Sequence, residues 1–115
     1  MKILVTDKLA DEAIQLLKNN GFEVKFEELD HDGIMKEIAD YDGIIVRSRT
    51  KVTADIIEKG ASGNLKVIGR AGIGVDNIDV KKATELGIKV VNSPTGSTMS
   101  VAELAIAHLL SLIHI

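Results

Sequence analysis

Five short apolar runs, separated by segments in which apolar residues recur at helical spacing, constrain the fold of this chain more than any other feature. The runs lie at residues 3–5, 24–26, 43–46, 66–68 and 88–91. Four of them are rich in Ile and Val without strict alternation, which is typical of parallel strands that are covered on both faces. Residues 24–26 alternate between apolar and polar, which indicates an edge strand.

The intervening segments carry the start and stop signals of helices. Thr53 and Asp79 are candidate N-terminal caps, while Gly21 and Gly87 stand where a left-handed residue would end a helix. Strand and helix therefore alternate with short connections, which predicts an α/β fold with a doubly wound parallel sheet. With right-handed crossovers, the expected strand order is 2-1-3-4-5.

The end of the chain has a different pattern. After the fifth apolar run comes a turn-rich loop at residues 92–98, followed by a new apolar helix. Ser100 and Glu103 have the spacing of a capping box at the start of that helix. Taken alone, the helix has nothing to pack against, so we expect an incomplete domain that is marginally stable and self-associates.

Composition narrows the classes of function. The chain has 115 residues, enough for one domain, a formal net charge of −3 and no cysteine. The charge argues against nucleic acid as a partner, and the lack of cysteine excludes disulfides and thiolate chemistry. Residues 101–115 are too short to span a bilayer comfortably, and the N-terminus lacks the pattern of a signal peptide. We therefore expect a cytoplasmic protein without a membrane partner.

Residues at the carboxyl ends of the expected strands are the candidates for function, because ligands bind at that edge of an open parallel sheet. Arg47, Arg49 and Arg70 lie at the ends of two strands, and a loop with Gly72 and Gly74 comes next. Arginine side chains match the geometry of carboxylates and phosphates, and successive amides around glycines can form an anion-binding nest. The expected site is a pocket for a small anionic metabolite.

Each of these features also has a simpler structural interpretation. The glycine loop could be an ordinary tight turn, and the arginines could be solvated surface charges. The loop does not match a dinucleotide-binding fingerprint, because Asn77 stands in the place of the third glycine. Asp76 and Asp79 fit turn and cap residues better than ligands. His31 has too few neighbouring ligands at fixed spacing for a metal site.

Three blocks of the sequence, at residues 46–53, 66–79 and 91–104, resemble the D-isomer-specific 2-hydroxyacid dehydrogenases. The resemblance implies a flavodoxin-like substrate domain whose first part is residues 1–98. Residues 99–115 would then begin a helix that crosses to an NAD-binding Rossmann domain. The resemblance also implies that the catalytic Arg, Glu and His lie beyond residue 115. No catalytic residue is therefore assigned, and the fragment alone is expected to be inactive.

Within the family, the likeness is greatest to members that oxidise 3-phosphoglycerate to 3-phosphohydroxypyruvate at the start of serine synthesis. It implies a small anionic 2-hydroxy or 2-oxo acid as substrate, NAD as cofactor, no metal site, and a homo-oligomer for the full-length enzyme. The residues implied to bind substrate are Arg47, Ser48, Arg70, Gly72, Ile73, Gly74 and Ser97. The residues implied to contact the cofactor are Ile73, Thr98 and Val101.

Three alternatives remain open at this point. A glyoxylate or hydroxypyruvate reductase, or a D-lactate dehydrogenase, would share the same sequence blocks. A regulatory module could keep the anion pocket without catalysis. A receiver-like signalling module would have the same topology, but it needs clustered acids at the ends of strands one and three, and Arg47 follows the third strand.

Overall fold

The computed structural model describes residues 1–93 and 95–112 and confirms the predicted topology. The strands are β1 (Lys2–Val5), β2 (Glu23–Phe26), β3 (Gly43–Val46), β4 (Val67–Arg70) and β5 (Lys89–Asn92). The helices are α1 (Asp11–Asn19), α2 (His31–Glu37), α3 (Ala54–Ala61), α4 (Val80–Glu85) and α5 (Thr98–Ser111), with a short 3-10 turn, η1 (Ile38–Asp40), after α2. The strands pair in parallel in the order β2-β1-β3-β4-β5.

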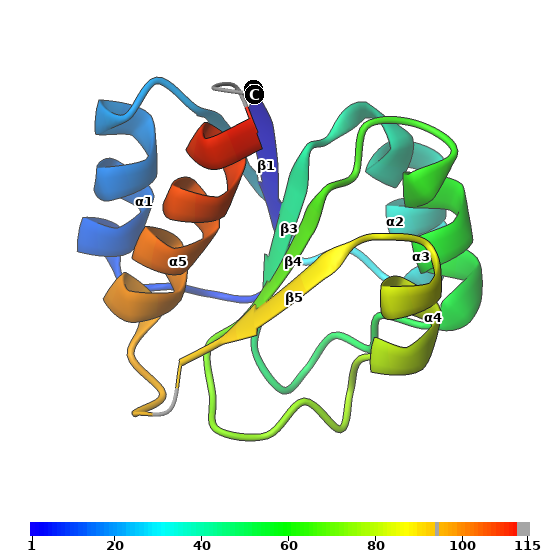
Figure 1. Cartoon of the computed structure of the whole chain (residues 1–115). Coiled ribbons are helices and arrows are strands. Elements are labelled where there is room, and N and C mark those ends of the chain that lie inside the picture. Colours follow the sequence, from blue (N-terminus) through cyan, green and yellow to red (C-terminus); the bar gives the residue numbers. More distant parts are fainter. Residues whose placement is uncertain (94, 113–115) are drawn as a thin grey trace.

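The helices cover the sheet in two layers (Figure 1). α1 and α5 lie on one face, and α2, α3 and α4 lie on the other. Successive strand residues face opposite sides, so Ile3 and Ile45 pack with α1 and α5, whereas Leu4 and Ile44 pack with the other helices. The central strands are thus buried on both faces, and β2 is the exposed edge strand that its alternating pattern predicted.

Most of the predicted helix ends are confirmed. The Asp79 carboxylate accepts a hydrogen bond from the amide of Lys82 at 3.0 Å and caps α4. Gly21 and Gly87 have φ values of 88° and 75°, the left-handed conformation that glycine adopts without strain. Thr53 occupies the N-cap position of α3, but its hydroxyl donates to the Asp55 carboxylate and makes no capping bond to the backbone.

α5 differs from the prediction in how it starts. The helix begins at Thr98, and its N-cap is Ser97, whose hydroxyl accepts from the Ser100 amide at 3.2 Å. Ser100 is therefore already inside the helix, and the predicted capping box of Ser100 and Glu103 is not formed. Continuation of the helix to Ile115 lies outside the described residues.

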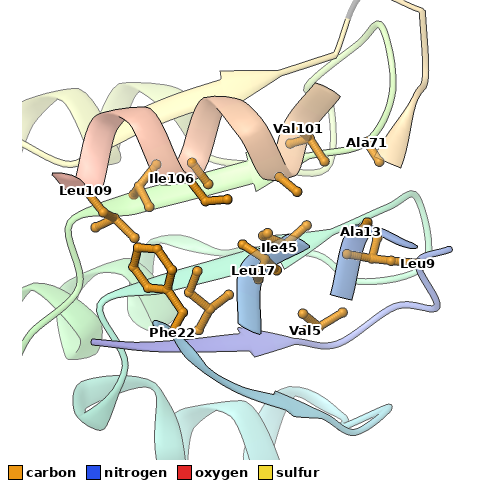
Figure 2. Close-up of a cluster of buried hydrophobic side chains, with 14 residues drawn as sticks. Val5, Leu9, Ala13, Leu17, Phe22, Ile45, Ala71, Val101, Ile106 and Leu109 are labelled. Atoms are coloured by element: carbon orange, nitrogen blue, oxygen red, sulfur yellow. The ribbon is translucent and has the colours of Figure 1, made fainter. Parts of the chain in front are cut away.

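The expectation that this helix has nothing to pack against is wrong. The three crossovers that carry α2, α3 and α4 leave α1 alone on its face of the sheet, and α5 fills the remaining space beside it. Figure 2 shows Val101, Ile106 and Leu109 in one cluster with Leu17 and Phe22. The expectation of self-association rested on an uncovered helix, and it loses that basis. Within the described ranges, none of the helices has the length and apolarity to cross a bilayer.

Close packing of α5 depends on a glycine in β4. A Cβ atom on Gly69 would lie 3.0 Å from the Val101 side chain, closer than side-chain contacts normally allow. Val101 is fully buried at this point, directly after the first turn of α5. Gly69 therefore lets the start of the helix lie against the carboxyl end of the sheet.

Candidate functional site

The candidate site lies at the carboxyl edge of the sheet, where the loops after β1, β3, β4 and β5 meet (Figure 1, lower part). Arg70 is the last residue of β4, and every other residue implied to bind substrate or cofactor comes from one of these loops or from the start of α5. Their side chains, however, do not form the single cluster that the sequence led us to expect.

A buried carboxylate that follows β1 organises the loop after β3. The side chain of Asp7 is almost inaccessible, and its Oδ2 atom accepts hydrogen bonds from the amides of Arg47 at 2.6 Å and Thr50 at 3.1 Å. Its Oδ1 atom accepts from the Thr50 hydroxyl at 2.6 Å and from Arg49 Nε at 2.9 Å. Four donors from one loop therefore converge on one carboxylate.

These donors decide the charge of Asp7. Burial acts to raise its pKa, but the hydrogen bonds from Thr50 and Arg47 and the charge of Arg49 outweigh burial and hold the pKa below its ordinary value. Asp7 is therefore ionised at neutral pH. Asp7 was not among the residues predicted from the sequence to matter at this edge.

Arg49 belongs to this internal network. Besides its bond to Asp7, its Nη2 atom donates to the carbonyl of Thr6 at 2.6 Å. The charge of Arg49 is thus compensated within the fold, and its guanidinium is committed to backbone and carboxylate oxygens. Of the three arginines expected to converge on an anion, this one has a structural role.

Asn77 holds the same loop from the opposite side. Its Nδ2 atom donates to the carbonyls of Arg47 and Thr50, both at 2.6 Å, and its Oδ1 atom accepts from Arg70 Nε at 2.6 Å. Asp7 therefore binds the amides of residues 47 and 50, while Asn77 binds their carbonyls. In the sequence, Asn77 stood out only as a departure from a glycine pattern.

The loop after β4 does not form the expected nest. Among the described residues, positive φ values occur only at Gly21, Gly87 and Gly96, so Gly72 and Gly74 do not take the left-handed dihedrals on which the nest prediction relied. At Gly72, the Arg70 guanidinium occupies the space that a Cβ atom would fill, so a side chain here would displace the guanidinium.

The tip of this loop is held open towards solvent. Asn92 Nδ2 donates to the carbonyls of Gly72 at 3.3 Å and Ile73 at 2.7 Å, and the Ile73 side chain is 75% exposed. The Gly72 amide is already bonded to the Arg70 carbonyl. An anion at this loop would therefore meet the amides of Ile73 and Gly74, for which no partner is found within residues 1–93 and 95–112.

A second part of the edge is a shallow groove between the loop after β1 and the start of α5. Its walls carry Arg47 and Lys8 on one side and Ser97, Thr98 and Met99 on the other. The Thr98 hydroxyl also accepts from the Ala10 amide at 3.4 Å, which ties α5 to this loop. The groove brings together a guanidinium, an ammonium group and two hydroxyls.

The two remaining arginines lie on opposite sides of the sheet. Arg70 is in register with Val46, which faces α2, α3 and α4, so Arg47 at the next position points to the α5 side. Arg47 and Ser97 thus share the groove, whereas the Arg70 guanidinium lies against Gly72 in the loop after β4. Ser48 is exposed and lies between residues 47 and 50, whose backbone atoms are hydrogen-bonded to Asp7 and Asn77.

The residues implied to contact the cofactor differ in accessibility. Ile73 is exposed and Thr98 is half-buried. Val101 has no exposed surface and packs over Gly69, so its side chain supports the groove from below without lining it.

His31, the first residue of α2, interacts with two aspartates, one of which belongs to α3. Its Nε2 atom is 2.7 Å from Asp55 Oδ2, and its Nδ1 atom is 3.4 Å from Asp32. Hydrogen bonds to Asp32 and Asp55 raise the pKa of His31 above its ordinary value. Among the described residues, no group of three or more His, Cys, Asp or Glu side chains is arranged to hold a metal ion.

Comparison with known proteins finds one family. Residues 3–110 match the family model for the D-isomer specific 2-hydroxyacid dehydrogenase catalytic domain. The chain is 48% identical to a D-3-phosphoglycerate dehydrogenase of Archaeoglobus fulgidus over 112 residues, which is 96% of this chain and 21% of that protein. It is 56% identical to a hydroxypyruvate reductase of Thermotoga maritima over 111 residues, 96% of this chain and 36% of that protein.

Solved structures show the same likeness. An NAD⁺-bound 3-phosphoglycerate dehydrogenase of Entamoeba histolytica superimposes with a TM-score of 0.70 and 36% identity, covering 80% of this chain and 32% of that one. A Pyrococcus horikoshii protein reaches a TM-score of 0.74 with 34% identity, covering 80% and 27% of the two chains. The chain thus spans between a fifth and about a third of the length of these relatives.

Proposed function

Because the chain belongs to the D-isomer-specific 2-hydroxyacid dehydrogenases, we propose that it forms the substrate-binding part of an NAD-dependent enzyme that oxidises 3-phosphoglycerate to 3-phosphohydroxypyruvate. One structural observation carries the proposal. At the carboxyl edge, Arg49 is tied to Asp7, whereas Arg47 lines the groove beside Ser97 and Thr98, and no partner for its guanidinium is found among the described residues. Matching relatives named D-3-phosphoglycerate dehydrogenase come from archaea, plants and animals, which supports this choice of substrate.

The proposed substrate carries a carboxylate, a phosphate and a hydroxyl group at C2. The planar guanidinium of Arg47 matches a phosphate, with Ser48 and Ser97 as hydroxyl partners nearby. The amides of Ile73 and Gly74 are suited to the carboxylate, and Arg70 under the same loop adds a positive charge. In this arrangement the chain binds and orients the two ends of the molecule, one on each side of the sheet edge.

NAD takes up the hydride from C2 of the substrate in this family. The residues of this chain fit only the nicotinamide end of NAD. Exposed Ile73 and the hydroxyl of Thr98 are suited to the wall that the nicotinamide ring faces, with Val101 packed behind them. The chain has no complete fingerprint for the pyrophosphate, since Asn77 stands in the place of the third glycine after Gly72 and Gly74. We therefore place the main NAD contacts and the acid–base residues in a further part of the enzyme, as the greater length of the relatives suggests.

The proposed division of the chain follows from the same reasoning. Residues 1–98 would belong to the substrate domain, and residues 99–115 would begin the connection to the NAD domain. Since α5 packs beside α1 on the sheet, we propose that this connection also completes the core of the substrate domain.

Binding of 3-phospho-D-glycerate to the 115-residue chain, measured by NMR titration, tests the proposal. We expect amide shifts at residues 47–48, 72–74 and 97–98, and weaker binding of D-glycerate, which lacks the phosphate. Arg47→Gln should remove the preference for the phosphorylated acid, because it removes the guanidinium that would bind the phosphate. The substitution should leave the loop in place, because Asp7 and Asn77 bind backbone atoms of residue 47. Lys89→Gln is the matched control, since this exposed cation begins β5 at the opposite edge.

Two outcomes would contradict the proposal. Equal affinity for D-glycerate and 3-phospho-D-glycerate would instead favour a substrate without phosphate, as for the hydroxypyruvate reductase relative. Shifts confined to residues outside the carboxyl edge would mean that the groove is not the binding site.

A further inference from the structure

We propose that Asn77 is a positioning residue. It orients the Arg70 guanidinium towards the substrate anion and fixes the position of this guanidinium relative to the loop that carries Arg47. The inference rests on the proposed function, because it assigns how the anion site of that function is held together. Its basis is the set of three hydrogen bonds that Asn77 makes to two neighbouring loops.

The hydrogen bonds of Asn77 leave no freedom in its orientation. Both hydrogens of its amide are used by the carbonyls of Arg47 and Thr50, and its oxygen accepts from Arg70 Nε. Exchanging the oxygen and nitrogen would set the NH₂ group against a guanidinium and the oxygen against two carbonyls. The donor pattern of the surroundings therefore fixes the amide.

One edge of the Arg70 guanidinium is held by Asn77, which accepts from its Nε atom. Its Nη1 atom lies where a Cβ of residue 72 would be, against the loop that carries the Ile73 and Gly74 amides. Within residues 1–93 and 95–112, no partner is found for the two Nη groups or for these amides, so they are donors for an anion on the loop side. An arginine that is already ordered loses less side-chain freedom when it binds an anion, so its affinity is higher than that of a freely rotating one.

Asn77 also couples the two halves of the site. The loop after β3 and the loop after β4 come from adjacent strands, and Asn77 is the side chain that joins the backbone of the first to the arginine of the second. Asp7 anchors the first loop from the β1 side, but it makes no bond to Arg70. The β3–β4 pairing fixes the backbone of Arg70 beside Val46, so it is the direction of the Arg70 guanidinium that depends on Asn77.

The test is a double-mutant cycle on the 115-residue chain with 3-phospho-D-glycerate as the probe. Asn77→Ala should weaken binding about tenfold, comparable with one charge-assisted hydrogen bond. In an Arg70→Ala background, Asn77→Ala should change the affinity much less, because the residue acts through Arg70. Asn64→Ala is the control, since this exposed asparagine lies at the opposite edge and should bind like the wild type.

A spectroscopic readout separates positioning from folding. The Nε–H signal of Arg70 should be sharp and protected in the wild type, and lost to exchange in Asn77→Ala. Asn77→Asp keeps an acceptor for Arg70 but loses both donors to the carbonyls, so the signal should persist while the affinity for the anion falls. This second variant keeps the proposal testable if Asn77→Ala fails to fold.

Three results would overturn the inference: unchanged affinity in Asn77→Ala, an equal loss with and without Arg70, or an Arg70 Nε–H signal that exchanges equally fast in the wild type and in Asn77→Ala. The last measurement needs no ligand. If the wild type binds neither 3-phospho-D-glycerate nor inorganic phosphate, the proposed function fails, and this signal alone decides whether Asn77 positions Arg70.

Discussion

Replacing Asp7 should destabilise the fold more than replacing any exposed acid. In Asp7→Ala, the amide and hydroxyl of buried Thr50 and the amide of Arg47 lose their acceptor, and Arg49 loses its buried counter-charge. A buried donor without a partner costs about 1–3 kcal/mol, and breaking a buried ion pair costs about 3–5 kcal/mol. Because Arg49 can turn towards solvent and Glu28, we expect a total loss of about 3–5 kcal/mol.

That loss is large for a chain of this size. At roughly 0.05–0.15 kcal/mol per residue, the whole domain has a free energy of unfolding of about 6–17 kcal/mol. Urea unfolding followed by circular dichroism measures the change, with Asp40→Ala as a control that should stay within about 0.5 kcal/mol of the wild type, because Asp40 is exposed.

The pH dependence gives an independent check. Since the pKa of Asp7 is lower in the folded protein than its ordinary value of 3.8, its contribution is fully present above about pH 4 and is lost as the pH falls through the folded-state pKa. The difference between wild type and Asp7→Ala should therefore shrink below pH 4. A loss under about 1 kcal/mol at pH 7, or a difference that stays constant down to pH 2, would refute the proposed role of the carboxylate.

Three further perturbations test other parts of the structure. Gly69→Ala should destabilise the chain by about 1–3 kcal/mol in urea, because the added methyl group meets Val101; an unchanged midpoint would contradict this packing. His31 should titrate above pH 6.5 in an NMR series and shift downwards in Asp55→Asn, and its pairing should add stability that is lost as the pH rises through its folded-state pKa. Deletion of residues 98–115 should make the remaining chain self-associate more strongly than the 115-residue chain on size-exclusion chromatography, since the face beside α1 becomes uncovered; an unchanged degree of association would show that α5 is dispensable.

The regular elements were predictable because their signals are local. The Ile- and Val-rich runs, the alternation in β2, and the stops at Gly21 and Gly87 depend on residues close in sequence, and the structure confirms each of them. The position of the candidate site at the carboxyl edge followed from topology alone. Placing a residue at this edge did not predict the direction of its side chain, so Arg47 and Arg70 were expected together and lie on opposite faces.

The roles of Asp7 and Asn77 could not be derived from sequence spacing. Asp7 lies 40 residues from Arg47, and Asn77 lies 30 residues from the same residue, so neither pair of partners falls within one local sequence motif. Such bonds arise when the loops meet at one edge and each buried amide and carbonyl requires a partner. The same limit applies to α5, whose covering surface is provided by α1 from the start of the chain.

The contact between α1 and α5 has a consequence for the order in which the chain folds. Ala10 and Thr98 are 88 residues apart in sequence, yet a hydrogen bond joins them. The layer of α2, α3 and α4 is built from successive strand–helix–strand units with short loop closures, which form rapidly. During synthesis this layer can assemble first, while the opposite face of the sheet, with α1 alone on it, stays open until α5 leaves the ribosome. Docking of α5 thus closes this face of the sheet, and the nascent chain would need protection from aggregation until then.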